Sequence, residues 1–435
     1  MAGARASRRS IAIVGAGWSG LACALSLARA GYAPVVFESA PEPGGRARRA
    51  KIDGTFRDNG QHLILAGCQA LTTLFEAIGL SLPRAPFAFK GDGRGLSLVN
   101  RRGRFGLVLA LCRAPGFNMK ERWALVRALL VLQRRRWQVS EAQTVAQWLK
   151  TQQQPPALIE HFWAPLALAI LNTPIEVAAM SRLAPVLRDT LGRGAAALEI
   201  LQPTADLSAS VVTTMVRALE AQGGQMHCGQ RVTGVRALPD GRHALSLQHA
   251  QMPTMVDDVV LAVPPWSLAH IDLPFDPTLL IEAFGVQPIA TVYLGFEDSV
   301  HLPTPLMQLA GPTEADARIW AMDRAHCGEP GVIALSLSAD GPWTQLDHDQ
   351  LAQQCLRQLQ ASLATRLHAH WHKVVMVHKA TPSMTPQAKI SAAHRHPLPG
   401  LWLLGDWTHP VYPATLEAAV AAGLALTEEI IASDS

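Results

Sequence analysis

Three glycines near the N-terminus have the spacing of a phosphate-binding turn. Gly15, Gly17 and Gly20 stand in the segment GAGWSG, between the apolar run IAIV and the helix-forming run LACALSLARA. Gly15 permits a tight turn, Gly17 lets the backbone approach a pyrophosphate, and Gly20 lets helix and strand pack closely. The free N–H groups and the dipole of the helix N-terminus favour an anion at this turn. We therefore expect these glycines, with Trp18 and Ser19, to hold the diphosphate of a dinucleotide.

An acidic residue completes this pattern. Glu38 lies 23 positions after Gly15, at the end of the strand-like segment YAPVVFES, where a carboxylate can accept hydrogen bonds from ribose hydroxyls. The uncharged run before it could also be the core of a signal peptide or a short membrane span, because Arg8 and Arg9 precede it. Three glycines within six positions argue against both alternatives, since each costs about 1 kcal/mol in a helix. The sequence therefore predicts a strand–turn–helix–strand unit at residues 11–38 and no signal peptide.

Two further segments carry groups that suit a dinucleotide. The segment PGGR places Gly44 and Gly45 before Arg46, so that the backbone can approach a phosphate and the guanidinium can neutralise it. Near the C-terminus, LLGDWT reads as a strand that ends in Gly405 and Asp406. The carboxylate of Asp406 could bind a ribityl hydroxyl group or order water at the pyrophosphate.

A helix near the C-terminus supplies the last part of the pattern. It begins in PATLEAAVAAG, near Thr415 and Leu416, and its N-terminus could stabilise negative charge on a flavin ring. The glycine turn, the GGR segment and the Gly-Asp pair before a helix together resemble the FAD-dependent amine oxidase and phytoene desaturase superfamily. Within it, DNGQHLILAGC, FWAPLALAILNTP, PIATVYLGFE and GDWTHPVYPATLEAAVAAG are similar to the hydroxysqualene dehydroxylases, also called squalene-associated FAD-dependent desaturases. The pattern departs at Thr381 and Pro382, where the resemblance predicts an aromatic residue.

The fold implied by the resemblance is α/β (α+β overall), with two interleaved domains. A Rossmann-like FAD-binding domain of the glutathione-reductase or amine-oxidase type is expected at residues 1–85, 205–270 and 395–435, where strand and helix patterns alternate. Residues 86–204 and 271–394 are expected to form a mixed sheet-plus-helix substrate domain. Its apolar helices could contact a membrane.

The activity implied is the reductive removal of the hydroxyl group of hydroxysqualene, a C30 allylic alcohol, to give squalene. The hydroxyl leaves as water with the help of a general acid, and reduced FAD delivers hydride to the allylic cation. His62 in NGQH is the first candidate for the acid because imidazole titrates near neutrality, and Asp58 could orient it. Alternatively, His62 only hydrogen-bonds the backbone or the cofactor, and Asp58 is structural.

Further site residues are expected from the same resemblance. Gln61 and Val232 should contact FAD, and Asn172, Trp163 and Tyr412 should line the substrate pocket. For Asn172 and Tyr412, hydrogen bonding within the core is an equal alternative.

Composition favours a lipophilic partner over a nucleic acid. Apolar residues make up 49% of the chain and charged residues 17%, and the net charge of +4 is small for 435 residues. The strongly apolar segments at 107–137 and 157–171 could be core, pocket wall or a membrane-contacting face. Trp123 and Trp137, with the basic run Arg134–Arg136, have the composition of an interfacial anchor. We expect a peripheral protein at the inner face of the cell membrane, with a C30 isoprenoid substrate, an external electron donor of unidentified kind, and no nucleic acid.

The cysteines and the clustered histidines indicate neither a disulfide framework nor a metal site. The six cysteines are scattered without a CxxC pair, which fits a reducing cytoplasm. His368, His370 and His372 alternate in HAHWHK, but the acidic ligands and supporting groups that a metal site needs are not evident nearby.

Other functions stay open at this point. One is a carotenoid-type or phytoene-type desaturase, and another is a flavin amine oxidase. The supply of only three tyrosines argues against the aromatic cage of an amine oxidase, although 11 tryptophans weaken this objection. A protein that binds flavin or lipid without catalysis is a third alternative.

Overall fold

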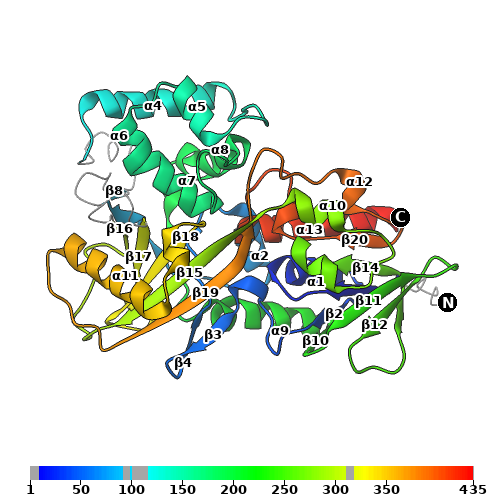
Figure 1. The fold of residues 1–435 in the computed structure, drawn as a ribbon. Helices are drawn as coiled ribbons and strands as arrows, with labels where there is room; N and C mark the ends of the chain where they lie inside the picture. The colour runs from blue at the N-terminus through cyan, green and yellow to red at the C-terminus, as the bar shows by residue number, and fades with distance from the viewer. Residues whose placement is uncertain (1–8, 92–97, 100–115, 310–317, 435) are drawn as a thin grey trace.

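The computed structural model describes residues 9–91, 98–99, 116–309 and 318–434. Figure 1 shows a parallel sheet at one end of the molecule, a larger mixed sheet at the other, and a group of helices above the mixed sheet. The predicted α/β fold is confirmed by this arrangement. The division into two interleaved domains at the stated boundaries stays a prediction.

A five-stranded parallel sheet carries the glycine turn at its carboxyl edge. The strand order is β10-β2-β1-β14-β20, so its neighbouring strands come from distant parts of the chain. The strands are β1 (Ile11–Val14), β2 (Val35–Glu38), β10 (Gln225–Cys228), β14 (Asp258–Leu261) and β20 (Leu401–Leu403). Every residue of β1 is buried because both faces of the sheet are covered, which explains its uncharged sequence.

The two faces of this sheet have different covers. Ile11 and Ile13 pack with helices α1 (Trp18–Arg29), α2 (Gln69–Ala77), α9 (Thr213–Ala221) and α13 (Leu416–Ser433). Ala12 and Val14 point the other way, because side chains alternate along a strand. They pack with helix α10 (Thr278–Ala283) and a small antiparallel sheet of β11 (Val232–Ala237), β12 (His243–Leu247) and β13 (Thr254–Val256).

The mixed sheet forms the floor of the second half of the molecule. Its order is β19-β15-β18-β17-β16-β7-β8. The strands are β19 (Trp371–Pro382), β15 (Val286–Gly295), β18 (Val332–Ser338), β17 (Ile319–Asp323), β16 (Leu306–Leu309), β7 (Ala88–Lys90) and β8 (Leu98–Val99). One face packs on helix α11 (His348–Leu363) through residues such as Leu335 and Leu337. The other face is turned toward the upper helices (Figure 1).

The upper helices form their own apolar core around Trp163 and Leu183. They are α4 (Met119–Arg134), α5 (Val145–Thr151), α6 (Pro156–Leu158), α7 (Ala164–Leu171) and α8 (Met180–Asp189). A π-helical turn at Ile159–Trp163 joins α6 to α7, and Pro165 is the second residue of α7.

Short elements connect these parts. They are the hairpin of β3 (Arg49–Ile52) and β4 (Thr55–Asp58), the small sheet of β5 (Ile64–Leu65), β9 (Ile200–Leu201) and β6 (Arg84–Ala85), and helix α12 (Ala392–Arg395). Among the described residues, no helix has both the length and the apolar character needed to cross a membrane.

Candidate functional site

A cavity of about 840 Å³ runs from the glycine turn of the parallel sheet to the space between the mixed sheet and α7. Its lining includes most of the residues predicted to bind a dinucleotide. These are Gly15, Gly17, Trp18, Ser19, Glu38, Gly44, Gly45, Arg46, Gln61, Val232, Gly405, Asp406, Thr415 and Leu416. Segments separated by nearly 400 residues in the sequence therefore meet around one space.

The glycine turn has the geometry that its spacing predicts. Gly15 has φ +107°, and a Cβ atom built on it would lie 2.5 Å from the carbonyl oxygen of Ala262. Gly20 does not line the cavity; a Cβ there would lie 2.1 Å from the carbonyl oxygen of Gly15. Helix α1 begins at Trp18 with Gly17 as its N-cap, which leaves first-turn N–H groups available to an anion.

The GGR segment lies against this turn. The N–H of Gly44 donates to the carbonyl of Ala16 at 2.8 Å. Gly45 has φ +61°, and a Cβ on it would lie 2.9 Å from the Cα of Gly17. The carboxylate of Glu38 accepts hydrogen bonds from the N–H groups of Ala16 and Ala40, both at 2.8 Å. Glu38 thus holds the turn in place as well as facing the cavity.

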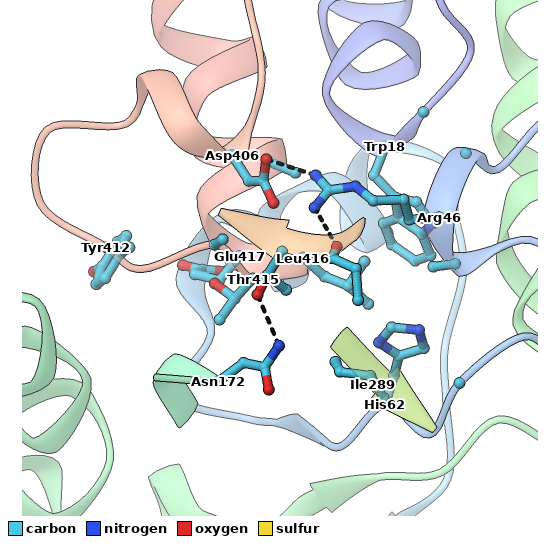
Figure 2. A pocket seen from close by; sticks show the side chains of 18 of the residues that line it. Trp18, Arg46, His62, Asn172, Ile289, Asp406, Tyr412, Thr415, Leu416 and Glu417 are labelled. Atoms are coloured by element: carbon cyan, nitrogen blue, oxygen red, sulfur yellow. Dashed lines mark hydrogen bonds and ion pairs between the residues drawn. The ribbon is translucent and has the colours of Figure 1, made fainter. Parts of the chain in front are cut away.

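Arg46 joins three distant segments at the centre of the cavity (Figure 2). Its Nη2 forms an ion pair with Oδ1 of Asp406 at 2.6 Å, and its Nη1 donates to the carbonyl of Ala380 at 2.8 Å. Its guanidinium also lies 5.8 Å from the ring centre of Trp266. Arg46 and Asp406, two of the charged residues predicted to contact the cofactor, therefore neutralise each other in this structure.

The N-terminus of α13 reaches the cavity at Thr415 and Leu416 (Figure 2). Thr415 caps the helix by accepting a hydrogen bond from the N–H of Ala418 at 3.2 Å. Glu417 turns away to cap α2, accepting from the N–H groups of Ala70 at 2.8 Å and Leu71 at 3.0 Å. Burial raises the pKa of the Glu417 carboxyl.

These residues fit a flavin dinucleotide. The indole Nε1 of Trp18 is buried beside the cavity and has no hydrogen-bond partner within the described residues. A buried donor without an acceptor is costly, so a ligand oxygen here would relieve that cost. The opposed glycines Gly17 and Gly45 leave backbone exposed where a side chain would fill the cradle. Gly15, Gly17, Gly45, Trp18 and the N-terminus of α1 would hold the diphosphate, and the N-terminus of α13 would face the ring.

His62 faces the cavity beside Ile289 and below Arg46 (Figure 2). Its side chain is open to the cavity but surrounded by protein. Desolvation by the surrounding protein, with the positive charge of Arg46, lowers the pKa of His62 to about 4. This shift favours the neutral imidazole, which can donate one hydrogen bond and accept another. The role of His62 as general acid stays a prediction.

Asp58 does not lie in the cavity lining and does not orient His62. Its Oδ1 accepts from the N–H of Leu207 at 2.7 Å, and its Oδ2 forms an ion pair with Arg324 at 3.4 Å. Burial raises the pKa of Asp58 despite these bonds. Both contacts fix the hairpin end from which the loop to His62 starts, so the structural alternative fits Asp58.

Gln61 is held by the same buried network. Its Nε2 donates to the hydroxyl of Tyr293 at 2.7 Å, and its Oε1 accepts from Nη1 of Arg324 at 3.1 Å. Tyr293 in turn donates to the carbonyl of Asp58 at 2.7 Å. These bonds fix the amide of Gln61 at the edge of the cavity, and the second N–H of its Nε2 is left for a ligand.

Three predicted substrate residues have different surroundings. Asn172 lines the cavity, but its Nδ2 donates to Thr381 Oγ1 at 2.9 Å and its Oδ1 accepts from the N–H of Ala339 at 2.6 Å (Figure 2). Trp163 is fully buried in the core of the upper helices, where its Nε1 donates to Gln154 at 3.0 Å, and it is absent from the cavity lining. Its neighbour Phe162 takes that place.

Tyr412 lies at one end of the cavity in a polar cluster that was not predicted. Its hydroxyl donates to Oδ2 of Asp189 at 2.6 Å, and Arg188 binds the same carboxylate through two nitrogens. Burial and the carboxylate raise the pKa of Tyr412 to about 12. The ring stacks on His409 at 5.0 Å between centres. The proton of Tyr412 is engaged with Asp189 rather than free for a substrate.

The floor of the apolar part of the cavity carries further residues that sequence reasoning missed. Ser336 and Ser338 alternate with Leu335 and Leu337, which pack on α11, so the serines face the cavity. Gln308 lies on the same face, only 2% exposed, and its Nε2 has no hydrogen-bond partner in the described part of the chain. The alternation of polar and apolar residues in GVIALSLS is a signal that could have identified the two serines.

The clustered histidines lie outside the cavity lining, whereas Cys68 is part of it. His370 pairs with Glu297 at 3.0 Å and His372 with Asp349 at 2.9 Å, on the exposed surface. Within the described ranges, no group of three or more His, Cys, Asp or Glu residues is arranged to hold a metal ion. Cys112 lies outside the described residues; the other five cysteines are free thiols.

Comparison with known proteins gives one consistent result. Residues 18–431 match the family model described as flavin containing amine oxidoreductase. The chain is 27% identical to a hydroxysqualene dehydroxylase of Rhodopseudomonas palustris, covering 98% of this chain and 99% of the relative. It is 25% identical to one of Zymomonas mobilis, covering 94% and 96%. A cyclohexylamine oxidase of Brevibacterium oxydans IH-35A shares the fold with a TM-score of 0.67 at 16% identity, covering 97% and 99%.

Proposed function

The chain belongs to the flavin containing amine oxidoreductase family and is a flavin-dependent oxidoreductase; on that premise we propose that it uses FAD to remove the hydroxyl group of hydroxysqualene reductively, giving squalene. The observation that carries this proposal is a cavity that joins a dinucleotide cradle to an apolar chamber. The names of the two relatives, which match over nearly their whole length, support the choice of substrate.

In the cofactor half of the site, we assign the following roles to individual residues. The turn at Gly15–Gly20, together with Gly45, would bind the diphosphate, Trp18 would donate its indole N–H to it, and the N-terminus of α13 would lie at the ring. Arg46 and Asp406 position each other beside it. FAD in its reduced form supplies hydride when bound there.

The substrate half suits a hydrocarbon with one hydroxyl group. Phe162, Leu166 and Ile170 from the upper helices face Ile289 and Val377 of the mixed sheet across the chamber. These side chains exclude water, which would otherwise capture a cationic carbon before hydride does. The overall reaction consumes one hydride and one proton, breaks the C–O bond, forms a C–H bond and releases one water molecule.

The proposal assigns hydrogen bonding of the leaving hydroxyl to neutral His62 and to Ser338. Ser338 pairs with Ile289 across the sheet, and Ile289 lies beside His62 (Figure 2). The neutral imidazole can polarise the C–O bond without carrying a charge that would repel a developing cation. A hydrogen-bonding role for His62, rather than that of an imidazolium acid, agrees with its lowered pKa.

A membrane surface is part of the proposal. At about 0.8 kcal/mol per buried CH₂, the transfer of a C30 isoprenoid from an apolar environment into water costs on the order of 20 kcal/mol of free energy. The substrate must therefore pass from a bilayer to the chamber without dissolving. We place the enzyme peripherally at the inner face of the cell membrane, where an external donor would reduce its flavin.

The test is product analysis with purified protein, FAD and a chemical reductant under anaerobic conditions. We expect hydroxysqualene in detergent to be converted to squalene and phytoene to stay unchanged. Desaturation of phytoene with oxidised flavin would favour a carotenoid-type desaturase instead. Bound flavin that turns over no isoprenoid would favour a binding protein without catalysis.

A further inference from the structure

The outer face of α4 is unusually apolar for an exposed helix. Met119 is 63% exposed, Trp123 66% and Leu130 42%. At about 100° per residue these three fall within about 40° of one another, so they form one stripe along the helix. Figure 1 shows α4 at the outer edge of the upper helices, away from the parallel sheet. This stripe of Met119, Trp123 and Leu130 is called the α4 stripe below.

A basic row follows directly beside the α4 stripe. Lys120, Arg127 and Arg134 are spaced seven residues apart, lie about 40–80° from the centre of the stripe, and are exposed. Arg135 and Arg136 continue the positive charge past the helix end. Glu121, the acidic residue of α4, is engaged in the capping box with Asn118. Nη2 of Arg127 also donates to the carbonyl of Gln152 at 2.7 Å. The face therefore combines apolar area with net positive charge.

The other flank of α4 leads to the cavity. Leu129 lies on the side opposite the basic row and lines the cavity. The inner face packs in the core of the upper helices through Leu125, Ala128 and Leu132. One helix thus contacts the core, the chamber and the outside, and the α4 stripe lies between Leu129 and the basic row.

We propose that the α4 stripe docks on an anionic lipid bilayer and that the basic row binds its phosphate headgroups. This inference rests on the proposed function, because docking would bring Leu129 and the chamber close to a substrate dissolved in the lipid. The apolar side chains enter the headgroup boundary, and the arginines and lysine stay at the level of the phosphates. A neutral protein partner would not need the basic row.

The α4 stripe differs from the anchor expected from sequence. Trp123 belongs to both. Trp137 instead packs on the upper helices, and a Cβ atom built on Gly192 would lie 2.6 Å from its ring. Met119 and Leu130 replace it. Their positions follow from the helical period and the exposure of each side chain, which composition alone does not give.

The experiment is co-flotation of purified protein with vesicles of phosphatidylcholine alone or with phosphatidylglycerol. The variant with Met119→Ser, Trp123→Ser and Leu130→Ser should bind at least about 100-fold more weakly to both. The variant with Lys120→Gln, Arg127→Gln and Arg134→Gln should lose about 5-fold per charge, on the order of 100-fold in all, on phosphatidylglycerol only. Added salt should weaken the wild type and leave the charge variant little changed.

The matched control is Met252→Ser with Leu279→Ser, which removes two more exposed side chains elsewhere (79% and 73% exposed). It should bind as the wild type does. Wild-type binding by the stripe variant, an equal loss in the control, or a dimer in solution that only the stripe variant dissociates would overturn the proposal. Turnover of hydroxysqualene in detergent should be equal in wild type and stripe variant. If detergent turnover is absent while stripe-dependent binding persists, the proposed function fails and the docking surface stands.

Discussion

His409 illustrates how one neutral side chain shapes the loop that leads to α13. Its Nδ1 accepts hydrogen bonds from the N–H groups of Val411 at 3.2 Å and Tyr412 at 2.8 Å. Burial and the positive charges of Arg182 and Arg395 lower the pKa of His409 to about 4. Protonation would remove the acceptor on which the loop depends.

This arrangement predicts a pH-dependent stability. The folded state holds the pKa of His409 near 4, below its ordinary value of about 6.5, so the unfolded chain binds the proton more readily. The contribution of this group is complete above pH 6.5 and is lost as the pH falls toward 4. Replacing His409 with Asn keeps an acceptor and removes the titration. The melting temperature should fall less between pH 6.5 and 4 in His409→Asn than in wild type; equal slopes would refute this role.

Asn172 gives a second prediction at the residue scale. It adopts a left-handed conformation with φ 45° and joins the end of α7 to the mixed sheet through Thr381, Pro288 and Ala339. Asn172→Ala should lower the free energy of unfolding by about 3 kcal/mol, because buried partners lose their bonds and alanine is strained there. Asn172→Gly should lower the free energy of unfolding by less, since only the side-chain hydrogen bonds are lost and glycine adopts the left-handed conformation without strain. Denaturant unfolding measures both, and equal losses would argue against strain.

Sequence reasoning identified residue types at this scale better than it identified their roles. The glycine spacing predicted the turn because a side chain at these positions would clash with nearby backbone or fill the cradle. His62 was expected to be the general acid, and its pKa depends on Arg46 and on desolvation by the surrounding protein, which only the folded chain defines. Gln308 gave no signal at all, because a single glutamine in an apolar strand has no pattern to mark it.

At the scale of elements, the cradle depends on two loops that approach at glycines. A Cβ atom added to Gly45 would lie 2.9 Å from the Cα of Gly17, in a backbone conformation with φ +61° that L residues rarely adopt. Gly45→Ala should therefore weaken FAD binding at least about 10-fold. The added Cβ atom would strain the backbone and would also push the loop of Gly45 away from the loop of Gly17. Fluorescence titration of the apoprotein with FAD measures the affinity.

A control separates strain from contact. Gly54 has φ +76°, and a Cβ there meets nothing within 4 Å in the described residues. Gly54→Ala should lower stability by a similar amount and leave FAD affinity unchanged. An equal loss of affinity in both variants would mean that the contact between Gly45 and Gly17 is unimportant.

The cap of α13 is local in the sequence, whereas that of α2 is not. Thr415 caps α13 locally, as a threonine before a helix commonly does. Helix α2 is capped by Glu417, which lies more than 340 residues away in the chain. Local patterns predict local caps, and such a distant cap becomes visible only when α2 and α13 pack together.

At the scale of the whole molecule, the cavity is the feature that the sequence described least. Its two ends were both anticipated, one as a dinucleotide turn and one as apolar helices. The floor of the cavity is one face of the mixed sheet. The residues that line the cavity there alternate with residues that pack on α11 on the opposite face. Strand order decides which of these residues become neighbours, and strand order is not a local property. The membrane-facing side proposed for α4 depends on packing for the same reason.

The central claim is that hydride passes from reduced FAD to the carbon that loses its hydroxyl group. Its most direct measurement is the reaction of hydroxysqualene with the reduced enzyme in D₂O, followed by mass spectrometry of the product. The exchangeable hydrogen on N5 of reduced flavin becomes deuterium in this solvent, so the account predicts squalene with one deuterium, at the carbon that carried the hydroxyl. Squalene without deuterium, or hydroxysqualene recovered unchanged, would contradict it.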